Sequence, residues 1–369
     1  MTGGLIVLFG IVSMVMIHEA GHFLAAKAFG MKATEFFFGF GPRIWSTKRG
    51  ETEYGVKAIP LGGYVRIIGM NPYEEVAPED EGRTYRERPF WQKSIVVLAG
   101  VASHFIVAFV LFFLVFSLIG VNTLSPTVSS VQDTLPDGGA TPAAEVGLEP
   151  GDRIVSIDGI ETPEWVDLVD VVSARPGETV TLRVERDGTI RPLEVTLASV
   201  DDQAGGKRGF LGVAPSTETE RVNPIVGFGR AGGAVGEAVV VSTQGMWQLV
   251  TGLGDLIGAT ITGDTEGIDE VRPASPIGLV RIGAQTQDLG IGFTLELVAL
   301  INVFVGLFNF IPIYPLDGGH FSVALYEKIR GREADVRKLA PIAAAVVIFM
   351  VLLGVLAIYL DIANPLDLN

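Results

Sequence analysis

The segment 18–22 contains three residues that could act together in one catalytic site, His18, Glu19 and His22. It lies inside an apolar run over about residues 4–28. On a helix the two histidines share one face, one turn apart, so both imidazoles can reach one ion. Glu19 points elsewhere, which suits a general base better than a further ligand. Two neutral imidazoles are typical of a catalytic zinc site, which would take a third ligand from elsewhere and keep one position for water.

The alternative is a chance motif, two histidines and a glutamate at a helix end near water. Its location favours the metal site, because ionisable residues inside a membrane-length apolar run are costly and usually mark function. Asp317 has the same problem, since it follows the expected span 292–311. Pro312 and Pro315 break that helix, and the glycines at 318–319 predict an irregular turn. A carboxylate buried there needs a cation as its partner.

Composition predicts a membrane protein. The chain has 369 residues, 48% of them hydrophobic, and no cysteine, so metal ligands must be His, Asp or Glu. The mean hydropathy of +0.43 is high for a soluble chain. A net charge of −15 argues against nucleic acid as a partner. The first apolar run has no signal-peptidase site after it and carries the His/Glu motif, so we interpret it as a retained membrane helix.

The expected fold is a multi-pass α-helical membrane protein with about four transmembrane helices, a membrane-associated β element and an inserted extracytoplasmic α/β domain. The first membrane part is 1–124 and the second is 291–369. Between them we expect a small domain of short strands and one helix at 125–215, and amphipathic surface helices at 222–290. The four expected spans are about 4–28, 93–121, 292–311 and 339–360.

The loop at 29–93 has strand character, with glycines that allow another backbone to approach closely. It is either an ordinary hairpin at the membrane surface or a sheet edge that pairs with an unwound substrate strand. His104 lies in the second span. An intramembrane histidine marks function or a hydrogen bond, and we favour a structural role because no ligand-type residue follows it by one turn.

Loop charge predicts the orientation. Residues 29–93 hold ten Lys and Arg and 313–338 hold five, whereas 122–290 hold eleven against twenty-five Asp and Glu. Short basic loops belong to the cytoplasmic side. The domain at 125–215 is then outside, and the histidine motif and Asp317 meet at the same depth, near the cytoplasmic face.

Taken together, these motifs resemble the site-two protease family of intramembrane zinc metalloproteases, of the bacterial regulator-of-sigma-E protease type. The resemblance covers almost the whole chain. Besides the motif at 18–22 it rests on glycine-rich stretches at 39–42 and 62–65, a PDZ-like signature at 147–159, and the run from Asn309 through Asp317 to His320.

The resemblance implies that His18, His22 and Asp317 bind Zn2+ and that Glu19 activates a water. It implies that Asn309 holds or polarises the substrate backbone. Its further implied substrate-binding residues are Gly62, Gly63 and Tyr64, in the β element that clamps an extended substrate.

The implied substrates are single-span membrane proteins, often anti-sigma factors already shortened by another protease, in the bacterial inner membrane. The PDZ-like domain would exclude intact ectodomains by bulk, the interpretation we favour, or bind a C-terminal carboxylate. Two alternatives have other functions: an inactive PDZ-bearing membrane scaffold, and a transporter with broken helices. The chain departs from many relatives in having room for one PDZ domain, and in the sequence of its second span at 99–104.

Overall fold

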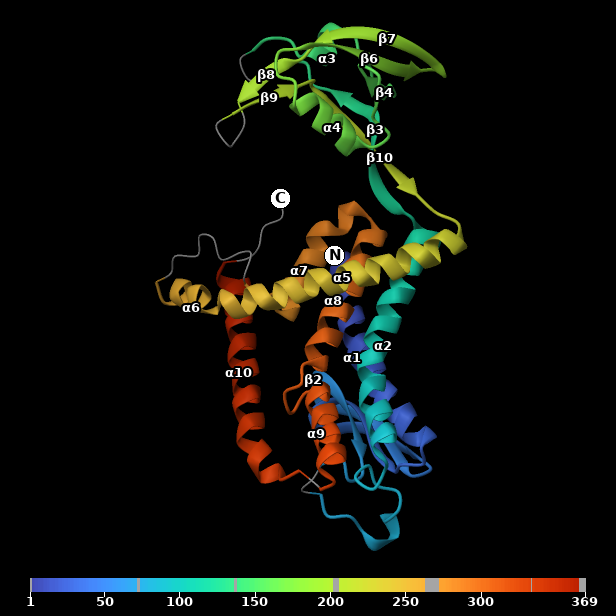
Figure 1. The fold of residues 1–369 in the computed structure, drawn as a ribbon, viewed down its shortest axis with the longest axis vertical. Helices are drawn as coiled ribbons and strands as arrows, with labels where there is room; N and C mark the ends of the chain where they lie inside the picture. The colour runs from blue at the N-terminus through green and yellow to red at the C-terminus, as the bar shows by residue number, and fades with distance from the viewer. Residues whose placement is uncertain are drawn as a thin grey trace. The chain divides into compact units, whose positions relative to one another are not determined.

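The computed structural model describes residues 2–71, 74–135, 138–201, 206–262, 272–332 and 334–364. These residues form two compact units, described separately here: one from residues 1–120 and 221–369, and one from residues 121–220. The first unit contains most of the helices and a small sheet (Figure 1). Among the described residues its helices are α1 (Thr2–Ala28), α2 (Phe90–Leu114), α5 (Pro224–Thr251), α6 (Leu253–Thr262), α7 (Pro276–Gln285), α8 (Ile291–Phe310), α9 (Asp317–Arg330) and α10 (Val336–Ala363).

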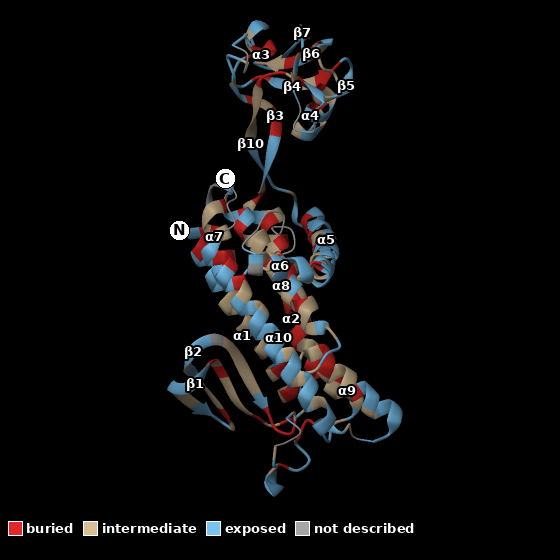
Figure 2. Ribbon diagram, turned by 90° about the vertical axis from the view of Figure 1, so that its left-hand side faces the viewer, coloured by how far each residue is buried: buried red, intermediate tan, exposed pale blue. Residues whose placement is uncertain are grey.

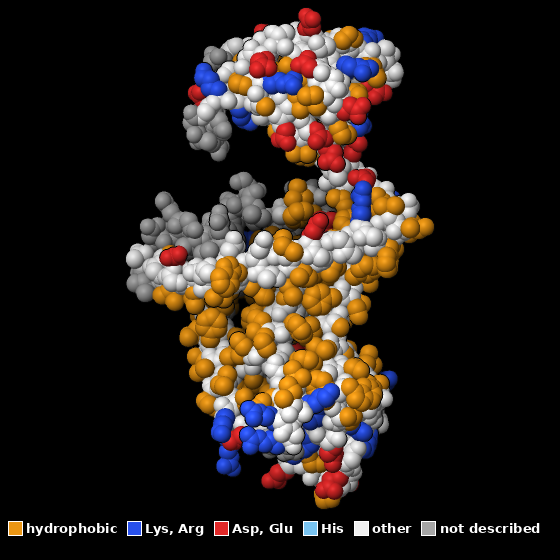
Figure 3. Space-filling model, in the orientation of Figure 1, with side chains coloured by type: hydrophobic (Ala, Val, Ile, Leu, Met, Phe, Trp, Pro, Cys, Tyr) orange, Lys and Arg blue, Asp and Glu red, His pale blue; other side chains and the backbone are white. Residues whose placement is uncertain are grey.

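Five helices within the described residues are long and apolar enough to cross a membrane: α1, α2 with its π-helical extension Val115–Ile119, α5, α8 and α10. Four of them coincide with the expected spans. The fifth, α5, was expected to be a surface helix, and it runs crosswise to α2, α8 and α10 (Figure 1). Apolar side chains cover the outside of α10 and α8 in Figure 3, and Lys and Arg gather at the end of the unit near α9.

Sequence signals set the helix ends. The side chain of Asn223 accepts hydrogen bonds from the backbone at the start of α5, and Ser275 does the same for α7; in both helices proline is the first residue. The predicted irregular turn at Gly318 and Gly319 is wrong, because α9 begins at Asp317 and includes both glycines. A Cβ on Gly318 would lie 2.1 Å from the Phe310 carbonyl oxygen at the end of α8, and one on Gly319 would lie 2.3 Å from the Tyr314 nitrogen, so both glycines serve close packing instead.

The small sheet is built from two long bent strands, β1 (Ala33–Arg49) and β2 (Thr52–Ile67). Each strand folds back at its glycines, so that residues 35–38 pair on one side with 53–56 and on the other with 63–66. Gly39, which has a φ of +87°, allows the bend. The segment 63–66 is therefore an edge of the sheet, and it packs beside α1.

The C-terminal end of α10 is held to the start of α7 by one buried carboxylate. Asp361 pairs with Arg272 at 2.8 Å and accepts the backbone N–H of Ser275 at 2.7 Å, and both charged side chains are almost fully buried. A Cβ on Gly278 would lie 2.3 Å from the Asp361 carboxylate, so this contact needs glycine. Much of α10 is exposed, as its pale blue colour shows in Figure 2.

The second unit is an antiparallel sheet with two short helices over a compact apolar core. Its strand order is β10-β3-β4-β6-β7, with β5 beside β4 and a separate pair β8-β9. The elements are β3 (Val121–Val131), α3 (Pro142–Glu145), β4 (Arg153–Ile157), β5 (Ile160–Glu161), α4 (Trp165–Ser173), β6 (Thr179–Arg186), β7 (Thr189–Thr196), β8 (Ala198–Asp201), β9 (Lys207–Phe210) and β10 (Val213–Glu220). Asp187 has a φ of +52° in the two-residue turn between β6 and β7, as its Asp-Gly sequence predicts.

A buried ion pair ties β4 to β6 in this unit. The Asp152 side chain is 1% exposed and accepts two hydrogen bonds from Arg186 at 2.6 Å. Burial alone would raise the pKa of the Asp152 carboxyl. The hydrogen bonds from Arg186 and from the Glu149 amide outweigh burial and hold that pKa below its ordinary value.

Candidate metal centre and active site

Two helices bring three ligand-type side chains together. His18 and His22 lie one turn apart on α1, and Asp317 is the first residue of α9. The Nε2 atom of each histidine is 3.3 Å from Asp317 Oδ2, and the two Nε2 atoms are 3.2 Å apart. One ligand atom from each residue lies within 4.8 Å of the other two, a group that could hold one metal ion. The two motifs, about 300 residues apart, therefore meet.

The protonation of His22 is set by the backbone of α2. Its Nδ1 is 2.8 Å from the carbonyl oxygen of Val96, and only an N–H can donate to that oxygen. In the neutral ring Nε2 then has a lone pair, and this atom faces Asp317. A hydrogen bond from the distal nitrogen to a carbonyl is the usual way in which a metal-binding histidine is oriented.

The three converging atoms are two imidazole nitrogens and one carboxylate oxygen. Asp317 Oδ2 is buried and has no hydrogen-bond donor among the described residues. A buried carboxylate oxygen facing two imidazole lone pairs is unfavourable without a cation. Two imidazoles and one carboxylate, with no thiolate available in this cysteine-free chain, are a donor set that fits catalytic zinc.

Gly100 on α2 allows this geometry. A Cβ on Gly100 would lie 2.3 Å from both Cε1 and Nε2 of His22, and 3.0 Å from Cε1 of His18. On the facing helix, a Cβ on Gly21 would lie 2.5 Å from the Ala99 carbonyl oxygen. Glycine on both helices thus lets α1 and α2 approach until the backbone of α2 touches the two imidazoles. Sequence reasoning assigned no packing role to Gly21, although it lies within the histidine motif, and it did not single out Gly100.

Glu19 contacts the edge of the small sheet. Its Oε2 accepts the backbone N–H of Val65 at 3.0 Å. A Cβ on Gly63 would lie 3.5 Å from Glu19 Cγ and 2.9 Å from Met16 Sδ, so β2 passes close to α1 here. Gly63 and Val65 therefore lie against the motif on α1, and the Val65 amide is a contact that sequence reasoning missed.

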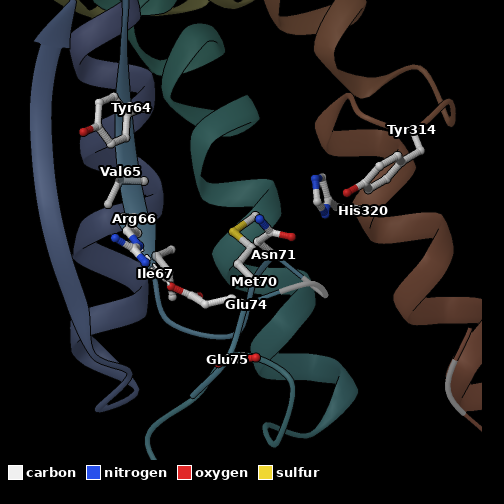
Figure 4. A pocket seen from close by; sticks show the side chains of 10 residues that line it. All are labelled: Tyr64, Val65, Arg66, Ile67, Met70, Asn71, Glu74, Glu75, Tyr314 and His320. Atoms are coloured by element: carbon white, nitrogen blue, oxygen red, sulfur yellow. Dashed lines mark hydrogen bonds and ion pairs between the residues drawn. The ribbon is translucent and has the colours of Figure 1, made fainter. Parts of the chain in front are cut away.

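A groove of about 720 Å3 runs beside this edge. Figure 4 shows residues 64–67 of β2 on one side and Tyr314 with His320 on the other. The Tyr64 ring stacks on Phe37, with 5.8 Å between centroids, and its hydroxyl donates to Glu35. Tyr64 thus lines the groove while its hydroxyl group is hydrogen-bonded within the sheet.

The remaining predicted residues lie on β2, α8 and α2. Gly62 is in β2 with a φ of +113°, a conformation that favours glycine. Asn309 is half-buried in the last turn of α8, and its predicted role toward substrate stays a prediction. His104, on α2, lies beside the centre, with 4.9 Å between its ring centroid and that of His18.

The chain is similar to known proteins over nearly its whole length. Residues 6–354 match Peptidase family M50. The chain is 33% identical to the zinc metalloprotease Rip1 of Mycolicibacterium smegmatis, over 98% of each chain. It is 31% identical to Rip1 of Mycobacterium tuberculosis, over 100% of this chain and 98% of the relative.

A solved PDZ domain of an SdrC-like protein from Listeria monocytogenes is also similar, with 24% identity, a TM-score of 0.19, and coverage of 24% of this chain and 87% of that one. The match to the peptidase family and to the two Rip1 proteins extends over nearly the whole chain. The chain belongs to peptidase family M50, the site-two proteases, and is a membrane-embedded zinc metalloprotease.

Proposed function

We propose that His18, His22 and Asp317 are the zinc ligands and that Glu19 is the general base. The observation that carries this proposal is the convergence of three acceptor atoms, one of them a buried carboxylate oxygen without a donor among the described residues. The ion, when bound, supplies a Lewis acid and lowers the pKa of a water at its open position.

Glu19 is placed for a base because one of its oxygens is already fixed. The Val65 N–H holds Oε2, which leaves Oε1 to take a proton from water and later give it to the leaving amine. Asn309, at the end of α8, would hold the substrate backbone or polarise the scissile carbonyl. The Nδ1–H of His22, fixed on Val96, keeps its ring oriented throughout.

The substrate is proposed to bind as an added strand along residues 63–66 of β2. Since N–H and C=O groups alternate in direction along a strand, the outward direction of the Val65 N–H means that Gly63 also presents its backbone on this side. The groove between this edge and Tyr314 has room for an extended segment. Gly62, Gly63 and Tyr64 would clamp it, and its scissile bond would lie near Glu19.

The proposed substrates are single-span membrane proteins, cut within or near their transmembrane segment, with anti-sigma factors first shortened by another protease as the expected class. The apolar helices support a place in the bilayer. The excess of Lys and Arg in 29–93 and 313–338 supports a bacterial inner-membrane orientation with the active site near the cytoplasmic face. The unit at 121–220 is then extracytoplasmic, and we propose that it excludes large ectodomains by bulk.

Zinc content tests the ligand set without a substrate. Purified wild type should hold about one zinc per chain, and His22→Ala and Asp317→Ala should each hold clearly less. Glu19→Gln should keep its zinc and lose cleavage of a single-span test substrate, because the ligands remain and the base does not. Zinc retained in Asp317→Ala would refute Asp317 as the third ligand. Cleavage by Glu19→Gln near the wild-type rate would remove Glu19 from the mechanism.

A further inference from the structure

His104 contacts the proposed metal centre but does not belong to its ligand set. It is 2% exposed on α2, and its ring is tilted by 37° against the ring of His18. Among the described residues, the cluster that could share one ion contains His18, His22 and Asp317 but not His104. A buried imidazole in contact with a ligand's imidazole could instead act on that ligand.

Asn302 on α8 sets which nitrogen of His104 carries the proton. The Asn302 Nδ2 donates to the carbonyl oxygen of Val298 at 2.8 Å, which fixes the orientation of the amide. Its Oδ1 then lies 3.4 Å from His104 Nδ1. Because a carbonyl oxygen can only accept, Nδ1 carries the hydrogen and Nε2 has the lone pair. That Nε2 is buried and has no partner among the described residues.

His18 has the complementary unpaired atom. Its Nε2 faces Asp317 and must have a lone pair to bind a metal, so Nδ1 carries the hydrogen. This Nδ1 is also buried without a hydrogen-bond partner that the described residues supply. The Gly100 carbonyl oxygen is a backbone acceptor for the His18 ring, but His18 shares it with Ser103 Oγ, which donates to it at 2.6 Å. The Val96 carbonyl oxygen accepts the Nδ1–H of His22 and so orients that ring. His18 has no backbone acceptor of its own among the described residues.

We propose that His104 is a positioning residue that accepts a hydrogen bond from His18 Nδ1–H through its own Nε2. The buried donor and the buried acceptor lie on rings whose centroids are 4.9 Å apart, a separation at which two imidazoles can share a hydrogen bond. The chain Asn302–His104–His18 then does for the first ligand what Val96 does for the second. The inference rests on the proposed function, since it takes His18 as a zinc ligand.

The test measures zinc affinity in the full chain by competition with a chromophoric chelator. His104→Leu removes the acceptor and should weaken zinc binding about 10- to 100-fold. His104→Gln has an amide oxygen near the position of Nε2 and should recover most of that loss. Asn302→Leu, which frees His104 to protonate either nitrogen, should weaken zinc in the same direction but less. Val303→Ala is the matched control, a buried change on α8 next to Asn302, and should leave zinc affinity within about twofold of wild type.

The visible spectrum of the cobalt-substituted protein gives a second measurement that depends on ligand geometry. We expect His104→Leu to change its band positions and His104→Gln to restore them. The proposal is overturned by wild-type zinc affinity and an unchanged cobalt spectrum in His104→Leu, or by equal losses in the Leu and Gln variants, which would indicate packing alone. If His104→Leu does not fold, the Gln and Asn302→Leu variants decide. Absence of zinc binding in wild type would refute the proposed function instead.

Discussion

The substitution Gly100→Ala tests whether the close contact between α2 and the two histidines is required for the site. It adds one methyl group in the interior of a helix, where alanine is favoured over glycine by about 1 kcal/mol, so helix formation itself does not suffer. The added Cβ would lie 2.3 Å from two atoms of the His22 ring. Carbon atoms in contact are about 3.5 Å apart. The ring or the helix must therefore move by roughly 1 Å.

The ring cannot give way at little cost. His22 is 4% exposed, and its Nδ1 is hydrogen-bonded to Val96 at 2.8 Å on the same helix that carries the new methyl group. Separating α1 from α2 would instead break the packing of Gly21 on Ala99. A displacement of about 1 Å at a catalytic group costs on the order of 100-fold in rate. A lost orienting contact costs about 10- to 100-fold in metal affinity.

We therefore expect Gly100→Ala to bind zinc at least about tenfold more weakly than wild type and to cleave a single-span test substrate about 100-fold more slowly at saturating zinc. Gly354→Ala on α10 is the control, because among the described residues nothing beyond its own stretch of helix lies within 4 Å of the added Cβ. It should match wild type in both assays. Wild-type zinc affinity and cleavage in Gly100→Ala would show that the helices relax freely and that the close approach does not set the site.

Three other predictions test other parts of the structure. Val65→Pro removes the N–H that holds Glu19 and should lower kcat about 10- to 100-fold while zinc content stays at the wild-type level; a change in zinc but not in kcat would contradict it. Asp152→Asn should destabilise the unit at 121–220 by about 2 kcal/mol at neutral pH, measured by hydrogen exchange in the full chain. The pKa of Asp152 is depressed in the folded state, so the ionised side chain stabilises the folded unit fully above the ordinary pKa of about 3.9. This stabilisation disappears as the pH falls through the lower folded pKa. The variant should therefore match wild type in stability only in strong acid. Asp361→Ala removes the carboxylate that pairs with Arg272 and accepts the Ser275 N–H. It should lower the free energy of unfolding by about 3–5 kcal/mol and expose the start of α7 to proteolysis; an unchanged thermal midpoint would contradict this.

Sequence reasoning was most successful where one physical requirement acts over many residues. Apolar runs of membrane length predicted α1, α2, α8 and α10 to within a few residues, because the bilayer demands such runs. Sequence reasoning also placed amphipathic helices within 222–290, and α5 is a single helix of 28 residues there. The turn predicted at the glycines of α9 is wrong, because glycine occurs at close packing contacts as well as in turns. Only the atoms that surround a glycine distinguish a packing contact from a turn.

At the site, the sequence predicted residue types but not the groups that hold them. The convergence of His18, His22 and Asp317 could be expected because each is costly to bury alone. The acceptor on Val96 and the donor on Val65 are backbone atoms, so no side-chain pattern marks them. Gly100 is similarly inconspicuous in an apolar helix, although the described structure leaves no space there for any other residue.

If the substrate adds to β2 as proposed, the hydrogen bond from Val65 to Glu19 couples substrate binding to the proposed base. A strand that shifts the Val65 amide and so favours one protonation state of Glu19 would have its own affinity altered by the protonation of Glu19, by the same factor. A variant such as Glu19→Gln, whose side chain still accepts a hydrogen bond, would preserve this coupling, whereas Glu19→Ala would abolish it. The two inactive variants would then differ in their affinity for an uncleaved substrate. Glu19→Gln is therefore the better variant for capturing a bound substrate.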